Sequence, residues 1–363
     1  MTRDQVFNFS AGPSVLPESV LLRAQAELLN YSGSGMSVME MSHRSAQYSA
    51  IFDETKAKLR AALSVPETHE ILFLQGGAST QFSMVPLNLL PVGGSADYAV
   101  TGHFSTSAAK EAAKYGAVRR AADTTEQKHT FIPVQDALDL DPNAAYFHYC
   151  ANNTIYGTEW QHVPQTGSGP LVCDMSSDIL SRPVDVAKYG LIYAGAQKNM
   201  APAGLTVVII DKAIAGHERP ETPLMLSYQR MIEKDSMFNT PPCWCIYILG
   251  LVLDWLNTQG GVAGMEQIKA ERAKKLYDFL DNSAIFHANA QPGSRSDMNV
   301  TFRTGDADLD TACVKGAAAE GLLNIKGHRV AGGMRASLYN AMPMAGVDAL
   351  IDYLKRFEVE HHG

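Results

Sequence analysis

The sequence predicts an α/β fold, in which a mostly parallel, mixed sheet forms a large domain and a smaller α+β domain follows it. Three observations support this class. Short apolar runs alternate with helix-like stretches up to about residue 260, the pattern then changes, and one pair of apolar runs lies too close together for a parallel connection. Strands that alternate with helices are typical of a parallel sheet covered on both faces.

Six apolar runs are the predicted strands of the large domain. They are residues 70–75, 96–102, 144–150, 170–176, 190–197 and 205–210. Residues 104–115 (FSTSAAKEAAKY) are an example of the helix-like segments between them. Only about eight residues separate the last two runs, which is too few for a crossover helix, so we expect one of these strands to run antiparallel to its neighbour.

The C-terminal part has a different order of elements. A long charged helix is predicted at 265–281, strands at 297–303 and 334–340, and two further helices at 309–321 and 346–358. We expect a large domain at 17–262 and a small domain at 263–363 that residues 1–16 join, with the long helix between the two.

Composition indicates an ordinary soluble globular protein. Hydrophobic residues make up 46% and charged residues 19% of 363, and the net charge of −8 disfavours binding to nucleic acid or an anionic membrane. The longest apolar run, 243–253, is too short to span a bilayer, and the N-terminus has no apolar secretion signal. We therefore expect a cytoplasmic protein. The five scattered cysteines have the spacing of reduced core thiols, and no metal site is expected.

Lys198 is the sharpest local signal of chemistry. It follows an apolar strand and lies among small residues, in AGAQKNMAPAG. Burial lowers the pKa of a lysine, and a neutral amine is a nucleophile toward aldehydes. A lysine at a strand end can also extend to solvent without any such role, and this fragment alone leaves both interpretations open.

Two further segments favour a cofactor site. Asp174 ends another apolar run, so both side chains are expected at the strand ends where α/β sheets bind ligands. Pyridoxal phosphate needs a lysine for its aldehyde and an acid for its ring nitrogen. The segment Gln75–Thr80 (QGGAST) joins a strand to a helix and suits a phosphate, although a glycine-rich turn by itself is weak support.

Basic residues point to an anionic substrate. His43 and Arg44 are adjacent, as are His328 and Arg329, and Arg335 follows two glycines. Arginine side chains match carboxylate and phosphate groups, and several of them suit a substrate with two or more negative groups.

Long strings along the whole chain resemble the phosphoserine aminotransferase family, which are class V pyridoxal phosphate enzymes with the aspartate-aminotransferase fold (fold type I). These strings are FNFSAGPS, VMEMSHRS, FLQGGASTQF, ADYAVTGHFS, HYCANNTIYG, DMSSDILSRP, YAGAQKNMAPAGLTVVI, SMFNTPP and KGHRVAGGMRASLYNAMP. The resemblance implies pyridoxal 5'-phosphate as cofactor and a homodimer with shared active sites.

The resemblance also implies a role for each matching residue. Lys198 corresponds to the Schiff-base lysine and Asp174 to the partner of the ring nitrogen. The other implied cofactor-binding residues are Ala78, Ser79, Phe104, Thr154, Gln197, Asn239 and Thr240, the last two from the partner chain. Arg335 is implied to bind the substrate α-carboxylate, and His43, Arg44, His328 and Arg329 to receive the distal anion, some again from the partner. Phe104 replaces a tryptophan of many members, and Ser79 replaces an arginine of some.

The implied reaction is reversible transamination of 3-phosphohydroxypyruvate with L-glutamate, giving O-phospho-L-serine and 2-oxoglutarate in serine biosynthesis. In many bacteria the same enzyme also converts 3-hydroxy-2-oxo-4-phosphonooxybutanoate to 4-phosphohydroxy-L-threonine for pyridoxine biosynthesis, and the sequence leaves this second reaction open. The alternatives are another class V enzyme, such as an alanine–glyoxylate type aminotransferase or a cysteine desulfurase, and a relative that binds the cofactor without turnover. Cys313 is the cysteine of the C-terminal part, and its helical context suggests a structural role.

Overall fold

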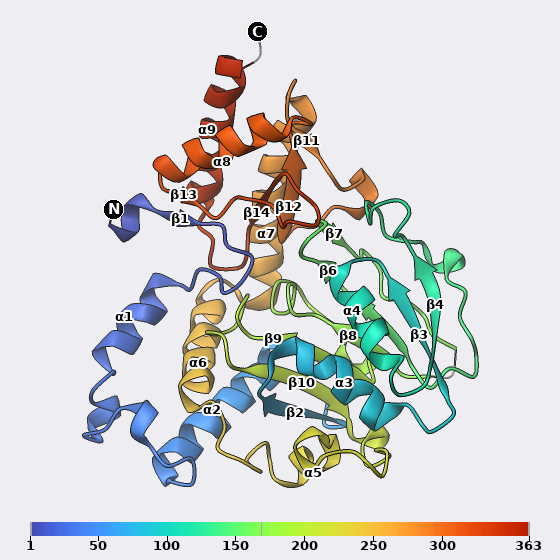
Figure 1. Cartoon of the computed structure of the whole chain (residues 1–363). Coiled ribbons are helices and arrows are strands. Elements are labelled where there is room, and N and C mark those ends of the chain that lie inside the picture. The colour runs from blue at the N-terminus through green and yellow to red at the C-terminus, as the bar shows by residue number, and fades with distance from the viewer. Residues whose placement is uncertain (1, 168, 362–363) are drawn as a thin grey trace.

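A seven-stranded mixed sheet forms the centre of the computed structural model, which describes residues 2–167 and 169–361 (Figure 1). The strand order is β2-β10-β9-β8-β5-β3-β4. Their bounds are His69–Leu74 (β2), Ser95–Val100 (β3), Ala117–Asp123 (β4), Phe147–Cys150 (β5), Leu171–Asp174 (β8), Leu191–Gly195 (β9) and Thr206–Asp211 (β10). Strand β10 is antiparallel to both β9 and β2. This confirms the predicted α/β class and the expected antiparallel strand.

Strand β4 at the sheet edge was not predicted. It pairs in parallel with β3 alone, and its sequence AVRRAAD is only partly buried. Arg119 of β4 forms an ion pair with the buried Asp97 of β3, with a distance of 3.2 Å between Nη1 and Oδ1. An edge strand can keep charged side chains at its exposed positions, so it lacks the apolar run that marks the inner strands.

Helices cover both faces of the sheet because successive strand residues point to opposite faces. On β2, Ile71 and Phe73 pack with α1, α2 and α6, whereas Leu72 and Leu74 pack with α3, α4 and α5. The bounds of these helices are Glu18–Ala26 (α1), Ala46–Ala62 (α2), Gly77–Leu89 (α3), His103–Ala112 (α4), Tyr228–Glu233 (α5) and Cys243–Thr258 (α6). Buried on both faces, the inner strands read as continuous apolar runs.

A second unit contains a three-stranded sheet, β11-β12-β14, and three helices (Figure 1). Its elements are α7 (Gly261–Asn282), β11 (His287–Ala288), β12 (Asn299–Arg303), α8 (Ala307–Ala319), β13 (Leu322–Leu323), β14 (Met334–Ser337) and α9 (Met344–His361). Its apolar core contains Phe9 together with residues between 273 and 357, and β1 (Phe7–Asn8) pairs with β13. The division into domains at residue 262 stays a prediction, which this separate core supports.

Two features are absent from residues 2–167 and 169–361. In that part of the chain, no helix is both long enough and apolar enough to cross a membrane. The same residues contain no group of three or more His, Cys, Asp or Glu side chains arranged to hold a metal ion.

Candidate active site

The candidate site lies at the carboxyl ends of the parallel strands in the centre of the large sheet. Strands β5, β8 and β9 are parallel, and Thr154, Asp174 and Lys198 stand at or just after their carboxyl ends. Strand β2 has the same direction as β9, because β10 is antiparallel to both. The glycine-rich turn after β2 therefore lies on the same side of the sheet as the carboxyl ends of β5, β8 and β9. For Lys198 and Asp174 this convergence was predicted from their positions at strand ends, whereas Thr154 was named through the family resemblance alone.

Lys198 is buried, with 9% of its surface exposed, and its amine makes two contacts with the site residues. Nζ donates a hydrogen bond to Thr154 Oγ1 at 2.7 Å and lies 5.6 Å from the centre of the Phe104 ring. The pKa of Lys198 is lowered from 10.5 to about 8, chiefly by burial and also by the positive charge of Arg335, against the opposing effect of Asp174. An amine with this pKa can both accept and return a proton near neutral pH.

Asp174 is a buried carboxylate with one oxygen that no strong donor satisfies. Its Oδ1 accepts a hydrogen bond from the Ser176 amide at 2.9 Å. Its Oδ2 is 3.9 Å from the Cys150 thiol, a weak donor and the one hydrogen-bond partner of this atom among the described residues. Burial raises the pKa of Asp174, while the hydrogen bonds from Ser176 and the charge of Lys198 oppose this. Asp174 is therefore able to accept a hydrogen bond from a cationic N–H group of a ligand.

The turn from β2 into α3 forms a backbone anion site. Gly76 has φ +90°, and a Cβ there would lie 2.1 Å from Thr80 Oγ1, so this position requires glycine. Thr80 Oγ1 itself donates to the Gly76 carbonyl at 2.9 Å. No side chain caps the N-terminus of α3, whose first turn contains Ala78 and Ser79. The free N–H groups and the positive end of the helix dipole are a favourable site for a phosphate group.

Arg335 connects the small sheet to this site. It lies on β14, and Nη1 donates to the Thr154 carbonyl at 3.3 Å. Its Nε is buried and has no hydrogen-bond partner in the part of the chain that the structure describes. Burial lowers the pKa of Arg335. An arginine with a free N–H at the edge of the site suits a carboxylate ligand.

His328 and Arg329 are in the loop that precedes β14. The ring of His328 lies 5.9 Å from that of His103, the first residue of α4, and the His103 ring lies 5.4 Å from that of Phe104. Arg329 is exposed. His103 was not predicted as a site residue. Its place directly after the end of β3, next to Phe104, was a signal that sequence reasoning could have used.

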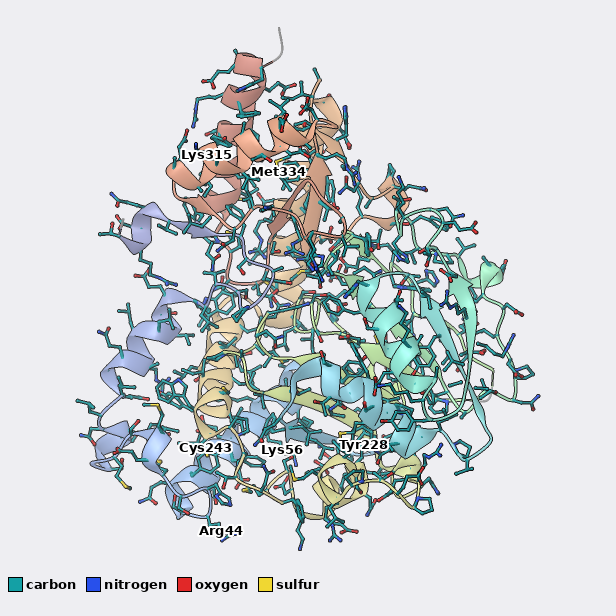
Figure 2. All side chains as sticks on the ribbon, in the orientation of Figure 1. Arg44, Lys56, Tyr228, Cys243, Lys315 and Met334 are labelled. Carbon is teal, nitrogen blue, oxygen red and sulfur yellow. The ribbon has the colours of Figure 1, made fainter. Side chains whose placement is uncertain are left out.

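The remaining predicted residues are less closely associated with Lys198 within one chain. Figure 2 shows Arg44 at the lower end of the molecule, far from Met334, which precedes Arg335 on β14. His43 is next to Arg44 in the segment before α2. These two residues therefore do not reach Arg335 of their own chain.

Asn239 and Thr240 lie beside the glycine-rich turn of their own chain. Asn239 Nδ2 donates to Gln75 Oε1 at 3.3 Å, and Gln75 Nε2 donates to the Thr240 carbonyl at 2.8 Å. Gln197 is half-buried, and its carbonyl accepts a hydrogen bond from the Ser14 amide at 2.9 Å. A contribution of Asn239 and Thr240 to the site of a partner chain stays a prediction.

Comparisons with known proteins give one consistent result. Residues 6–350 match the family described as aminotransferase class-V. A curated relative, the phosphoserine aminotransferase of Pseudomonas putida, is 52% identical over 357 residues, which cover 98% of this chain and 99% of the relative. The solved structure of phosphoserine aminotransferase from Bacillus circulans subsp. alkalophilus is 43% identical, with a TM-score of 0.96 and coverage of 98% and 99%. The pyridoxal-phosphate-bound phosphoserine aminotransferase of Trichomonas vaginalis is 39% identical, with a TM-score of 0.92 and coverage of 96% and 99%.

Proposed function

The chain belongs to the class-V aminotransferase family, and we propose that it transfers the amino group of L-glutamate to 3-phosphohydroxypyruvate, reversibly, to give O-phospho-L-serine and 2-oxoglutarate. The observation that carries the proposal is the pairing, at one sheet edge, of a buried lysine whose pKa is about 8 with the buried carboxylate Asp174. The confirmed resemblance to phosphoserine aminotransferases supplies the substrates.

The described residues fit pyridoxal 5'-phosphate. Lys198 supplies an amine for the aldehyde, and the incompletely satisfied Oδ2 of Asp174 suits the protonated ring nitrogen. The uncapped N-terminus of α3 at Ala78 and Ser79 suits the phosphate, with Gln197 nearby in our proposal. Phe104 provides an aromatic face for the ring, and Thr154 a hydroxyl for its phenolic oxygen. When bound, this cofactor supplies an electron sink for the bond that breaks at the substrate α-carbon.

Proton transfer is the task of Lys198 in this proposal. An amine with a pKa of about 8 is partly neutral near pH 7. Nζ can therefore take the α-proton from the substrate and give a proton back in a later step of the reaction. The hydrogen bond to Thr154 Oγ1 orients Nζ. Asp174 stays charged when a cationic N–H group lies against it, because an opposite charge lowers the pKa of a carboxylate.

Substrate recognition requires cations at two distances from Lys198. We propose that Arg335 binds the α-carboxylate, because its Nε is buried and free to donate. His328 and Arg329 receive the distal phosphate or γ-carboxylate. His43 and Arg44 join them from a partner subunit, since within one chain they lie far from Arg335. The family resemblance implies that Asn239 and Thr240 reach the cofactor phosphate of the partner, and with His43 and Arg44 this leads us to propose a homodimer with shared sites.

The five cysteines are all free thiols, as expected in a reducing compartment, and we propose a cytoplasmic enzyme.

The second candidate function is that of a class V aminotransferase with a different amino acid substrate. A cysteine desulfurase is disfavoured because Cys313 is fully buried and burial raises the pKa of its thiol to about 12. The related conversion of 3-hydroxy-2-oxo-4-phosphonooxybutanoate to 4-phosphohydroxy-L-threonine is a further proposed activity, since both keto acids carry a phosphate.

A steady-state assay tests the proposed function. The purified enzyme with pyridoxal phosphate is given L-glutamate and, in separate reactions, 3-phosphohydroxypyruvate, glyoxylate or pyruvate, and the 2-oxoglutarate formed is measured. We expect 3-phosphohydroxypyruvate to give the highest kcat/KM by at least about 100-fold, because it alone uses the distal cation group. A higher kcat/KM with glyoxylate would favour the second candidate.

A further inference from the structure

Four basic residues lie at the site without any acidic partner. They are His103, His328, Arg329 and Arg335. None of them makes an ion pair within residues 2–167 and 169–361, although the chain carries a net charge of −8. Two arginines and two imidazole rings that have no acidic partner in an acidic protein indicate a site for an anion. His103 is the one member that neither the sequence reasoning nor the proposed function has used.

His103 is held in place by the start of α4. The Ser105 hydroxyl accepts hydrogen bonds from the amides of Thr101 at 3.1 Å and Gly102 at 3.0 Å, which fixes the turn from β3 into the helix. The imidazole lies edge-on to Phe104 at 5.4 Å. In the described part of the chain no hydrogen bond involves the His103 ring, and the residue is exposed. Its ring nitrogens are thus available to a ligand.

His328, on the facing loop, is fixed just as firmly. The amides of Ala331 and Gly332 donate to the His328 carbonyl at 3.0 and 2.8 Å, and the Gly327 amide donates to the Gly333 carbonyl at 2.8 Å. Nδ1 of His328 accepts a hydrogen bond from the Val330 amide at 3.3 Å, so in the neutral ring the proton is on Nε2. No atom of the described residues accepts a hydrogen bond from this Nε2–H group. Burial lowers the pKa of His328, and the neighbouring basic residues, Arg335 first among them, lower it too.

We infer that His103 is a further substrate-binding residue, which together with His328 contacts the distal phosphate and favours phosphorylated substrates over glutamate. The inference rests on the proposed function and deepens it. A phosphate monoester has three terminal oxygens and nearly two negative charges, whereas the γ-carboxylate of glutamate has two oxygens and one charge. The smaller anion can be satisfied by His328 and Arg329. The larger tetrahedral group has a further oxygen for His103, whose ring centre lies 5.9 Å from that of His328.

Substitution of His103 tests the inference in the holoenzyme. In His103→Ala we expect the KM for O-phospho-L-serine to rise about tenfold, because a hydrogen bond to a charged group is lost, and the KM for L-glutamate to change less than threefold. Inorganic phosphate, measured as a competitive inhibitor of the glutamate reaction, is expected to bind about tenfold more weakly. In His103→Arg, which keeps a hydrogen-bond donor at this position, both constants are expected to return toward the wild-type values.

The matched control is His217→Ala. His217 is also exposed, but it follows β10 and therefore lies at the opposite edge of the sheet from Lys198. The inference is overturned if His103→Ala leaves phosphate inhibition and the KM for phosphoserine within twofold of wild type, or raises the KM for glutamate equally. If wild-type enzyme does not use phosphoserine at all, the proposed function fails, while phosphate inhibition of the glutamate reaction still tests His103.

Discussion

Replacing Lys198 with methionine is expected to abolish amino transfer and, at neutral pH, to stabilise the protein without cofactor. Methionine has a similar length but no charge to bury. The folded protein lowers the pKa of Lys198 from 10.5 to about 8, chiefly by burial. Since one pH unit corresponds to about 1.36 kcal/mol, keeping this amine protonated in the folded state at pH 7 costs about 3 kcal/mol. Loss of the hydrogen bond to Thr154 offsets about 1 kcal/mol, so the variant should gain about 2 kcal/mol.

The pH dependence identifies the cause. Because the folded pKa lies below the unfolded value, the unfolded chain binds more protons between about pH 8 and 10.5, and the free energy of unfolding of the wild type rises with pH across that window. At pH 9.5 the cost has fallen by about 2 kcal/mol, and the two proteins should be about equally stable. Equilibrium urea unfolding of both cofactor-free proteins, at one protein concentration and at pH 7 and 9.5, measures this difference.

Lys269→Met is the matched control. Lys269 is 3% exposed, but its Nζ lies 3.2 Å from Glu159 Oε1 and 3.4 Å from Asp297 Oδ2. Its removal takes the closest cation from the buried Glu159 carboxylate, whose Oε1 then has only Arg182 Nε at 3.9 Å as an ion-pair partner among the described residues, so we expect a loss of about 3 kcal/mol. The reasoning about Lys198 is refuted if Lys198→Met is less stable than wild type at pH 7, or if the difference between them does not shrink at pH 9.5.

Three further substitutions test the site. Asp174→Asn should lower kcat about 100–1,000-fold by removing a buried charge that faces the reacting group, with unchanged circular dichroism, and an effect under threefold would contradict this role. Gly76→Ala should raise the dissociation constant of pyridoxal phosphate in a titration, since the added Cβ would lie 2.1 Å from Thr80 Oγ1; Gly93→Ala, with φ +79° and open space around it, is the control and should bind like wild type. Arg335→Lys should raise KM for both glutamate and phosphoserine about tenfold or more in initial-rate measurements, because lysine lacks the planar fork; an unchanged KM would exclude it from carboxylate binding.

Local patterns were sufficient to predict the inner sheet and the residues at its edge. Strands β2, β9 and β10 are buried on both faces, so their apolar runs are evident without knowledge of their neighbours. Lys198 and Asp174 were predicted as a pair, because both are associated with the ends of such runs and pyridoxal phosphate needs a lysine and an acid; either residue alone left a structural role open. Strand β4 was missed because its exposed edge retains Arg119 and Arg120.

Contacts between distant segments could not be predicted in this way. Glu159 and Lys269 form a buried ion pair although 110 positions separate them, and nothing local to either residue indicates the other. His103 gains its significance from His328, which belongs to a loop far along the chain. In the proposed homodimer, Arg44 and Asn239 act in the site of a second chain, so a single protomer does not test their roles.

We propose that Lys198 and Asp174 enable bound pyridoxal phosphate to take the amino group of O-phospho-L-serine. The most direct measurement adds O-phospho-L-serine to the enzyme with bound pyridoxal phosphate and no keto acid, and records the absorbance spectrum and the keto acid released. We expect the visible absorbance of the bound cofactor to decay as one equivalent of 3-phosphohydroxypyruvate forms per chain, and Lys198→Met to show neither change. A spectrum that phosphoserine leaves unaltered while another amino acid changes it would contradict the substrate, and a protein that binds no pyridoxal phosphate would contradict the whole account.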